Sequence, residues 1–167
     1  MSKSSFISIP VRPHVRQFLL QEFGPDNPEP HRVHQNTYLG KQILLVAEKL
    51  PYRLTRAAAV PPLRTSYRIQ LPKVLKHYAI TEEGRQRLGE GLEKYFQDNL
   101  IMFVKGQVAV TGNELAALKM FFNYYDINPD DYDLEAGRKQ YRDYKDKMLR
   151  YNTVFQQVDT GILVLAR

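Results

Sequence analysis

Prolines place the first constraint on the fold of this chain, because they interrupt its N-terminal half repeatedly. The segment 25–33, PDNPEPHRV, has three prolines in nine residues and is expected to form a loop. Pro61 and Pro62 exclude a continuous helix over 51–72, since proline lacks the backbone N–H and its ring clashes with the preceding turn. Regular elements of this half must therefore lie between these breaks.

Two short strands are expected in the proline-interrupted half. The segment 5–11, SFISIPV, alternates apolar with small residues, and the segment 65–71 places Tyr67, Ile69 and Leu71 on one face. Alternation with a period of two is typical of a half-buried strand. Each segment is therefore predicted to pack one face against a core.

Helix start and stop signals identify three helices along the first two thirds of the chain. Pro13 opens a helix that Gly24 ends, and Asn36 can cap a second helix over 37–50. Thr81, followed by two glutamates, begins a long third helix, because its hydroxyl and the acids suit the exposed N–H groups of a first turn.

Two further helices are expected at the C-terminal end. The TGNE spacing at 111–114 is that of a capping box, and Asn128 followed by Pro129 is a second start signal after a tight connection. The chain is therefore predicted to have a predominantly helical α+β fold with about five helices. It is expected to end in an αα-hairpin or a helix-turn-helix-like pair.

Length and composition bound the class of protein. A chain of 167 residues can bury the core of one domain, so 1–167 is expected to be a single domain. It has no cysteine, which excludes disulfides and a thiolate nucleophile and fits a reducing compartment. Its longest apolar runs, at 43–47 and 100–104, are too short to span a bilayer. A soluble, cytoplasmic protein without a membrane partner is expected.

Charge is segregated along the chain, whose net charge is +6. Residues 1–80 carry 12 Lys or Arg and 4 acids, residues 81–137 carry 5 and 11, and residues 138–167 carry 7 and 3. Such segregation is typical of a basic surface for a polyanion, with an acidic middle that an internal or intersubunit partner could contact.

The most basic segment runs from Lys49 to Thr81 and has seven cations and no acid in 33 residues. Its cations are solvated, paired with the acidic helix expected at 82–98, or offered to a polyanion. Within it, 51–64 is bounded by prolines and is expected to form a basic arm or loop that follows a phosphate backbone. The candidate nucleic-acid-binding residues of this segment are Arg53, Arg56, Arg64, Arg68, Lys73 and Lys76.

A second candidate surface lies in GRKQYRDYKDKMLRYN, residues 137–152, which is expected to be helical. At about 100° per residue, one arc of roughly 80° holds an apolar stripe that is expected to face the core. Beside the stripe, Arg138, Arg142 and Lys145 form a basic flank with no acid among them, which is either a phosphate track or an uncommitted edge. The stripe consists of Tyr141, Tyr144, Met148, Tyr151 and Phe155.

Catalytic and metal-binding patterns are weak throughout the chain. The triplet DTG at 159–161 is followed by only six residues and is expected to be a turn between two strands. Asp143 and Lys145 would diverge by about 200° on a helix and therefore do not form a metal-dependent nuclease site. His31 and His34 lie in a proline-rich segment without a fixed acid nearby. No enzyme, metal or cofactor is predicted.

The arrangement FFNYYDINPDDYDLEAGRKQYRDYKDK, residues 121–147, resembles the C-terminal part of small, basic, poorly characterised proteins of bacterial phages and integrative elements. Such proteins have a helix, an acidic turn and then a helix rich in tyrosine and arginine. The resemblance covers 27 of 167 residues and transfers no site. It implies a mobile-element origin and a role related to nucleic acid. Gly137 departs from what a recognition helix would hold.

The sequence therefore predicts a protein that binds nucleic acid, in the first place duplex DNA. Binding is expected to neutralise backbone phosphates with limited base reading, as in a mobile-element regulator or accessory factor. The alternative is a protein-interaction module that meets an acidic partner or forms a homodimer through its acidic middle.

Overall fold

The computed structural model of the chain describes residues 6–24, 30–49, 65–71, 75 and 78–164, with the backbone alone for 152–164. Within these residues, five helices and five short strands form the predominantly helical α+β fold that the sequence predicts. The elements are β1 (Phe6–Pro10), α1 (Pro13–Phe23), β2 (His31–Arg32), α2 (Tyr38–Val46), β3 (Ala47–Lys49), β4 (Ser66–Gln70), β5 (Tyr78–Ile80), α3 (Glu82–Thr111), α4 (Glu114–Tyr124) and α5 (Leu134–Val164).

β1, β4 and β2 form a three-stranded sheet in that order, with β1 antiparallel and β2 parallel to β4. Ile9 pairs with Tyr67 and Ile7 with Ile69, so that these side chains share one face. Ile9, Tyr67 and Ile69 are completely buried, which confirms the alternation predicted for both strands. β2 lies in a segment expected to be a loop, and its pairing with β4 makes these two residues a strand.

α2 begins and ends differently from the prediction. Thr37 rather than Asn36 caps it, and the Thr37 hydroxyl accepts a hydrogen bond of 3.1 Å from the Gly40 N–H. α2 ends at Val46, and the next three residues form β3, which pairs antiparallel with β5. The helix predicted over 37–50 is therefore too long, because pairing with a strand far along the chain outweighs the local helical pattern.

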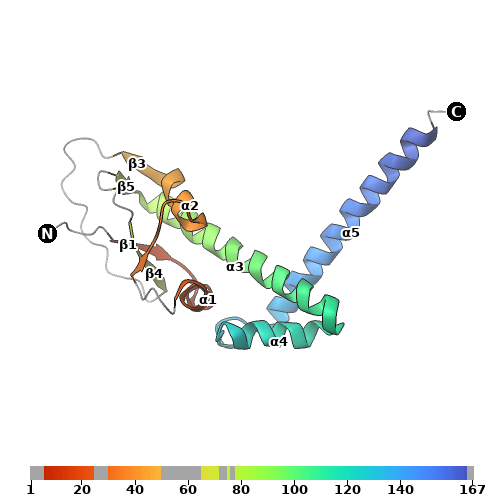
Figure 1. Cartoon of the computed structure of the whole chain (residues 1–167), viewed down its shortest axis with the longest axis horizontal. Coiled ribbons are helices and arrows are strands. Elements are labelled where there is room, and N and C mark those ends of the chain that lie inside the picture. Colours follow the sequence, from red (N-terminus) through yellow and green to blue (C-terminus); the bar gives the residue numbers. More distant parts are fainter. Residues whose placement is uncertain (1–5, 25–29, 50–64, 72–74, 76–77, 165–167) are drawn as a thin grey trace.

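The 30-residue helix α3 is the axis of the fold. As predicted, the Thr81 hydroxyl caps it by accepting a hydrogen bond of 3.1 Å from the Gly84 N–H, and Gly112 ends it with a left-handed φ of 67°. β1, α1 and α2 contact α3 on one side of the molecule, and α4 and α5 contact it on the other (Figure 1). Its continuous buried row consists of Leu88, Leu92, Phe96, Leu100 and Val104.

α4 and α5 form the predicted terminal helix pair, but both helices begin elsewhere than predicted. Asn113 rather than Thr111 caps α4, and its Oδ1 accepts a hydrogen bond of 3.0 Å from a first-turn N–H. α5 begins at Leu134 instead of Pro129, where Asp133 Oδ1 accepts from the first-turn N–H groups. The connection between the helices is therefore longer than the tight one expected.

Gly137 allows α5 to lie close to α4. A Cβ atom at this position would be 3.1 Å from Leu118 Cδ2 and 3.6 Å from Phe122 Cε2, and both of these side chains belong to the core. A Cβ atom here would require the neighbouring side chains to shift by a few tenths of an ångström. The glycine that is unexpected in a recognition helix has a packing role here.

α5 extends well beyond the helices against which it begins (Figure 1). It is helical through 159–161, so the turn between two strands predicted there is wrong. None of the helices in the described part of the chain has the length and hydropathy that crossing a bilayer requires.

The predicted core stripe of α5 is buried only in its first half. Tyr141 is 5% exposed and Tyr144 is half-buried, whereas Met148 is 38% and Tyr151 is 51% exposed. The assignment of Met148 and Tyr151 to the core is therefore wrong, because α5 has by then passed beyond α3 and α4 (Figure 1). The side chain of Phe155 lies outside the described part of the structure.

Two glycines of α3 provide a matched test of how tightly β1 packs. A Cβ atom at Gly89 would lie 2.2 Å from the Pro10 carbonyl oxygen, whereas one at Gly91 would meet nothing within 4 Å. We expect Gly89→Ala to lower the free energy of unfolding by about 1–3 kcal/mol. Gly91→Ala should raise it by up to about 1 kcal/mol, because alanine favours helix. Urea unfolding measures both, and equal stabilisation would contradict the close packing of β1 on α3.

Candidate nucleic-acid interface

The three-stranded sheet has one face turned away from the core, and Arg68 lies at its centre. Arg68 is on the central strand β4, between Tyr67 and Ile69, whose side chains are buried on the other face. Successive side chains of a strand point to opposite faces, so Arg68 points outward, and it is exposed. Ser8 of β1 lies opposite it in the register.

Arg32 and Phe6 lie on either side of Gln70, the next residue of β4 after Arg68 that points to this face. Both pair with Gln70 in the register, Arg32 from β2 and Phe6 from β1. His31, the neighbour of Arg32, is buried with its ring 5.2 Å from that of Tyr67, so Arg32 points outward and is exposed. Phe6 is 48% exposed. The outer sheet face is defined here as Phe6, Ser8, Arg32, Arg68 and Gln70.

The outer sheet face combines two guanidinium groups with an aromatic ring, and its three strands contain no acidic residue. A guanidinium group stays charged and can bind phosphate oxygens through two N–H donors, and an exposed ring can stack on a base. The acid-free pattern of segment 49–81 predicts a binding role for Arg68 but none for Arg32 or Phe6, which lie outside that segment. A two-residue strand has no periodic signal, so nothing in the sequence places Arg32 beside Arg68.

The acids of α3 already have cationic partners. Of the five acids within 82–98, four lie in ion pairs, three of them within α3 itself. These pairs leave little negative charge on α3 for the acid-free segment 49–81. The pairs are Glu82–Arg85, Glu83–Arg87, Asp98–Lys94 and Glu93 with both Arg12 and His14.

Glu93 joins α3 to the start of α1, next to the end of β1. Its carboxylate oxygens lie 3.5 Å from Nε2 of His14, which is 2% exposed, and 3.6 Å from Nε of Arg12. The contact with His14 is the main cause that holds the pKa of Glu93 below its ordinary value; burial opposes it and the charge of Arg12 adds to it. Burial raises the pKa of the neighbouring Tyr132 to about 12, so its hydroxyl remains protonated.

The basic flank of α5 is not free of acids in the folded chain. Arg138 Nη1 lies 2.7 Å from Glu135 Oε1, and Lys145 forms an ion pair with Glu114 of α4. The Lys145 ammonium group also lies 5.3 Å from the centre of the Tyr141 ring. Arg142, between them, is exposed. Two of the three cations are thus paired with acids, Arg138 within α5 and Lys145 with α4, and this pairing does not favour a phosphate track.

The other predicted site residues lie outside the described part of the chain. They are Arg53, Arg56, Arg64, Lys73 and Lys76, together with the predicted arm 51–64.

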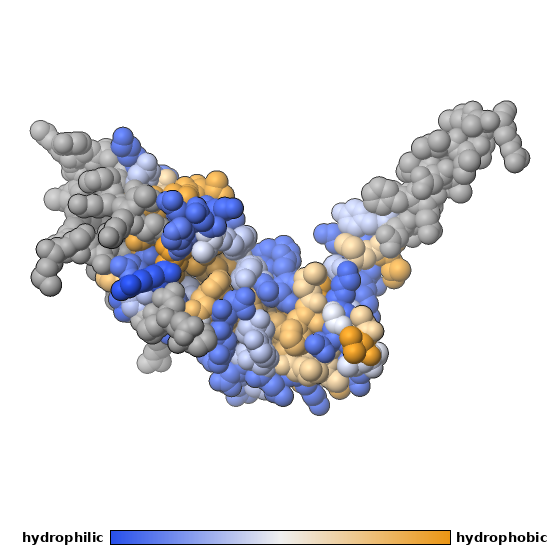
Figure 2. Space-filling view, viewed as in Figure 1, coloured by the Kyte–Doolittle hydropathy of each residue, from blue (hydrophilic) through white to orange (hydrophobic). Residues whose placement is uncertain are grey.

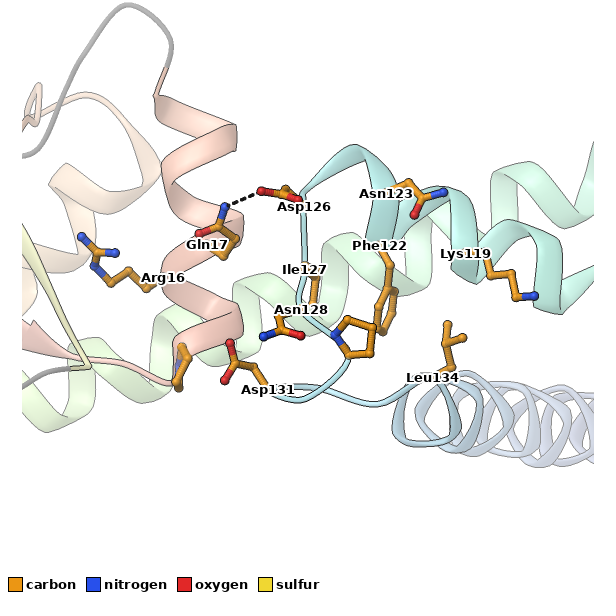
Figure 3. Close-up of a pocket in the computed structure, with 12 residues that line it drawn as sticks. Arg16, Gln17, Lys119, Phe122, Asn123, Asp126, Ile127, Asn128, Asp131 and Leu134 are labelled. Carbon is orange, nitrogen blue, oxygen red and sulfur yellow. Dashed lines mark hydrogen bonds between the residues drawn. The ribbon is translucent and has the colours of Figure 1, made fainter.

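A pocket of about 970 Å³ lies between α1, α4 and the connection that leads to α5 (Figure 3). Gln17 of α1 donates a hydrogen bond of 3.4 Å to Asp126 Oδ2, and Asp126 has a left-handed φ of 51°. Its lining includes two cations, Arg16 and Lys119, and two acids, Asp126 and Asp131. This mixture of charges does not favour a polyanion, and the outer sheet face is the better candidate interface.

No protein-family model, curated protein or solved structure matches this chain. Among the residues that the structure describes, no three His, Asp or Glu side chains form a cluster that could hold a metal ion. The candidate interface therefore rests on the charge and geometry of its own residues.

The contact between Glu93 and His14 predicts a pH dependence of stability. Because the pKa of Glu93 is lowered in the folded chain, its stabilising effect is present above the ordinary glutamate pKa of 4.5 and is lost as the pH falls through the lowered value. We expect Glu93→Gln to cost about 1–3 kcal/mol at pH 7. The difference from wild type should shrink below about pH 4.5. Glu90→Gln, at an exposed position of α3, is the control for urea unfolding across this pH range.

A constant difference at every pH would contradict a role for the ionised Glu93 carboxylate. An equal loss in Glu90→Gln would show that the general charge of α3, and not the contact with His14, is responsible.

Proposed function

We propose that this protein binds nucleic acid, in the first place duplex DNA, through the outer sheet face and the acid-free segment 49–81. On this proposal it is a cytoplasmic DNA-binding protein that acts as a regulator or accessory factor of a mobile element. The proposal gives the phosphate-binding role to Arg32 and Arg68 together with the cations of the acid-free segment.

The ion pairing of α3 is the observation that carries this proposal. The acid-free segment holds seven cations, and the acidic helix that follows it along the chain was the alternative partner for them. Four of the five acids of α3 within 82–98 form ion pairs with cations that lie outside the acid-free segment. A segment rich in cations and without acids, next to a helix whose acids are mostly paired, favours a polyanion, because phosphates offer regularly spaced negative charges.

The chemistry of the outer sheet face supports backbone contacts more than base reading. Arg32 and Arg68 lie on adjacent strands, so both can contact one strand of a nucleic acid, while Phe6 offers a ring for stacking. Gln70 supplies the single amide among the five residues of this face, and amide side chains are those that read adenine. Weak sequence preference is therefore expected.

A protein-interaction module is the second candidate function. It is favoured by the acidic connection between α4 and α5, which holds Asp126, Asp130, Asp131 and Asp133 within eight residues. Asp130 and Asp131 are exposed there. A basic partner could contact this surface without any nucleic acid.

Salt dependence provides the first test of DNA binding. Each neutralised phosphate contributes about 0.9 to the slope of log K against log salt, so four to six contacts should weaken binding by about a hundredfold or more between 50 and 200 mM salt. Fluorescence anisotropy with a random-sequence duplex measures this. Absence of binding at 50 mM salt would remove the proposal and favour the interaction module.

A pair of double variants tests the outer sheet face. We expect Arg32→Ala with Arg68→Ala to weaken DNA binding by at least about tenfold and to lower the salt slope by about 2, since two phosphate contacts are lost. Lys139→Ala with Arg150→Ala removes the same charge from exposed positions of α5 and should change affinity little. Thermal melting of both variants shows whether the fold is kept. Equal weakening by both pairs would mean that net charge alone drives binding.

A further inference from the structure

α5 carries an apolar row with the spacing of a coiled coil. Its members follow one another at alternating steps of three and four residues, which is a period of 3.5. Such a row winds slowly around a straight helix and stays in contact with a partner only if the two helices supercoil. The row, called the α5 seam here, consists of Leu134, Gly137, Tyr141, Tyr144, Met148, Tyr151, Phe155, Val158 and Ile162.

The first half of the α5 seam is packed within the chain. Gly137 meets Leu118 and Phe122 of α4, and Tyr141 is buried. Leu134 and Tyr144 pack against the same core cluster. The seam is therefore a packing surface wherever the chain supplies a partner helix.

The second half of the α5 seam begins where the contacts of α5 with the rest of the chain end. Met148 and Tyr151, the next two members, are substantially exposed, and α5 continues away from α3 and α4 (Figure 1). Hydrophobic residues reach the surface of α5 just before the part drawn in grey (Figure 2). From Met148 to Val164 the helix is about 25 Å long at 1.5 Å per residue. Helices in proteins gain most of their stability from packing an apolar face, so the exposed apolar row of this segment favours a packing partner.

The net charge of the C-terminal part of α5 indicates which kind of partner could cover the second half of the α5 seam. Residues 148–164 contain one cation, Arg150, and one acid, Asp159, and so carry no net charge. This balance does not favour a polyanion. It does not favour a membrane surface either, because helices that lie on membranes are rich in Lys and Arg on their polar face. An apolar row with heptad spacing fits another helix with the same spacing, and a second copy of the chain supplies one by symmetry.

We propose that the protein forms a homodimer in which the second half of the α5 seam, from Met148 to Ile162, packs against the same row of a second copy as a two-stranded coiled coil. The inference goes beyond nucleic-acid binding and does not depend on it. The first half of the seam continues directly into the dimer contact, so one helix face serves both the core and the assembly.

Sedimentation equilibrium of the full chain tests the dimer. Wild type should sediment at twice the mass of the 19.5 kDa chain in the low micromolar range. Tyr151→Glu places a charge in the seam and should weaken the dimer at least tenfold, whereas Tyr151→Leu, with the residue favoured at this position of a dimer, should preserve or tighten it. Thr153→Glu adds the same charge about 200° away on the helix and is the control, with an unchanged dissociation constant.

Three outcomes would overturn the proposal. The first is a wild-type chain that remains monomeric at 100 μM, including one that instead binds phosphatidylglycerol vesicles through α5. The second is equal dissociation by Tyr151→Glu and Thr153→Glu, and the third is a dimer that neither changes. Circular dichroism shows whether the Tyr151→Glu monomer keeps its fold, and Tyr151→Leu tests the seam even if that variant unfolds.

Discussion

The aromatic cluster around Phe96 holds together parts of the chain that are far apart in sequence. The Phe96 ring lies 5.5 Å from Phe18 of α1, 6.0 Å from Phe121 of α4 and 5.4 Å from Tyr132 of the connection to α5, all measured between ring centres. Because Phe96 is in the middle of the buried row of α3, this cluster ties the sheet side of the molecule to the terminal helix pair. The outer sheet face and the α5 seam both depend on that axis for their positions.

Ion pairing determines which charges remain for a partner. α3 satisfies most of its acids with cations one turn away or with the start of α1, whereas Lys145 is joined to Glu114 across the helix pair. Paired charges at a surface contribute little to stability, but they do decide the sign of the surface that a ligand meets. The positive charge of the α5 flank is thereby reduced in the folded chain.

The two proposals combine into one arrangement. A dimer joined through α5 would carry two outer sheet faces, and two linked basic surfaces bind one polymer more tightly than either does alone. The α5 seam continues along the whole helix, whereas the α4 and core residues that cover it contact only its first half. Gly137 and Tyr141 pack in the core, whereas Met148 and Tyr151 are exposed on the single chain.

Features that depend on neighbours along the chain can be predicted from the amino-acid sequence. The cap at Thr81, the helix between Pro13 and Gly24, the alternation of β1 and β4 and the segregation of charge all follow from spacing over a few residues. Contacts between distant parts of the chain are responsible for the end of α2 at β3, for the position of Arg32 on the face of the sheet that holds Arg68, and for the ion pair between Lys145 and Glu114. The length of the α5 stripe that is buried also depends on the tertiary structure, because burial stops after Tyr144. Each of these depends on a partner about thirty or more residues away or on where a neighbouring helix ends, and local periodicity contains no information about either.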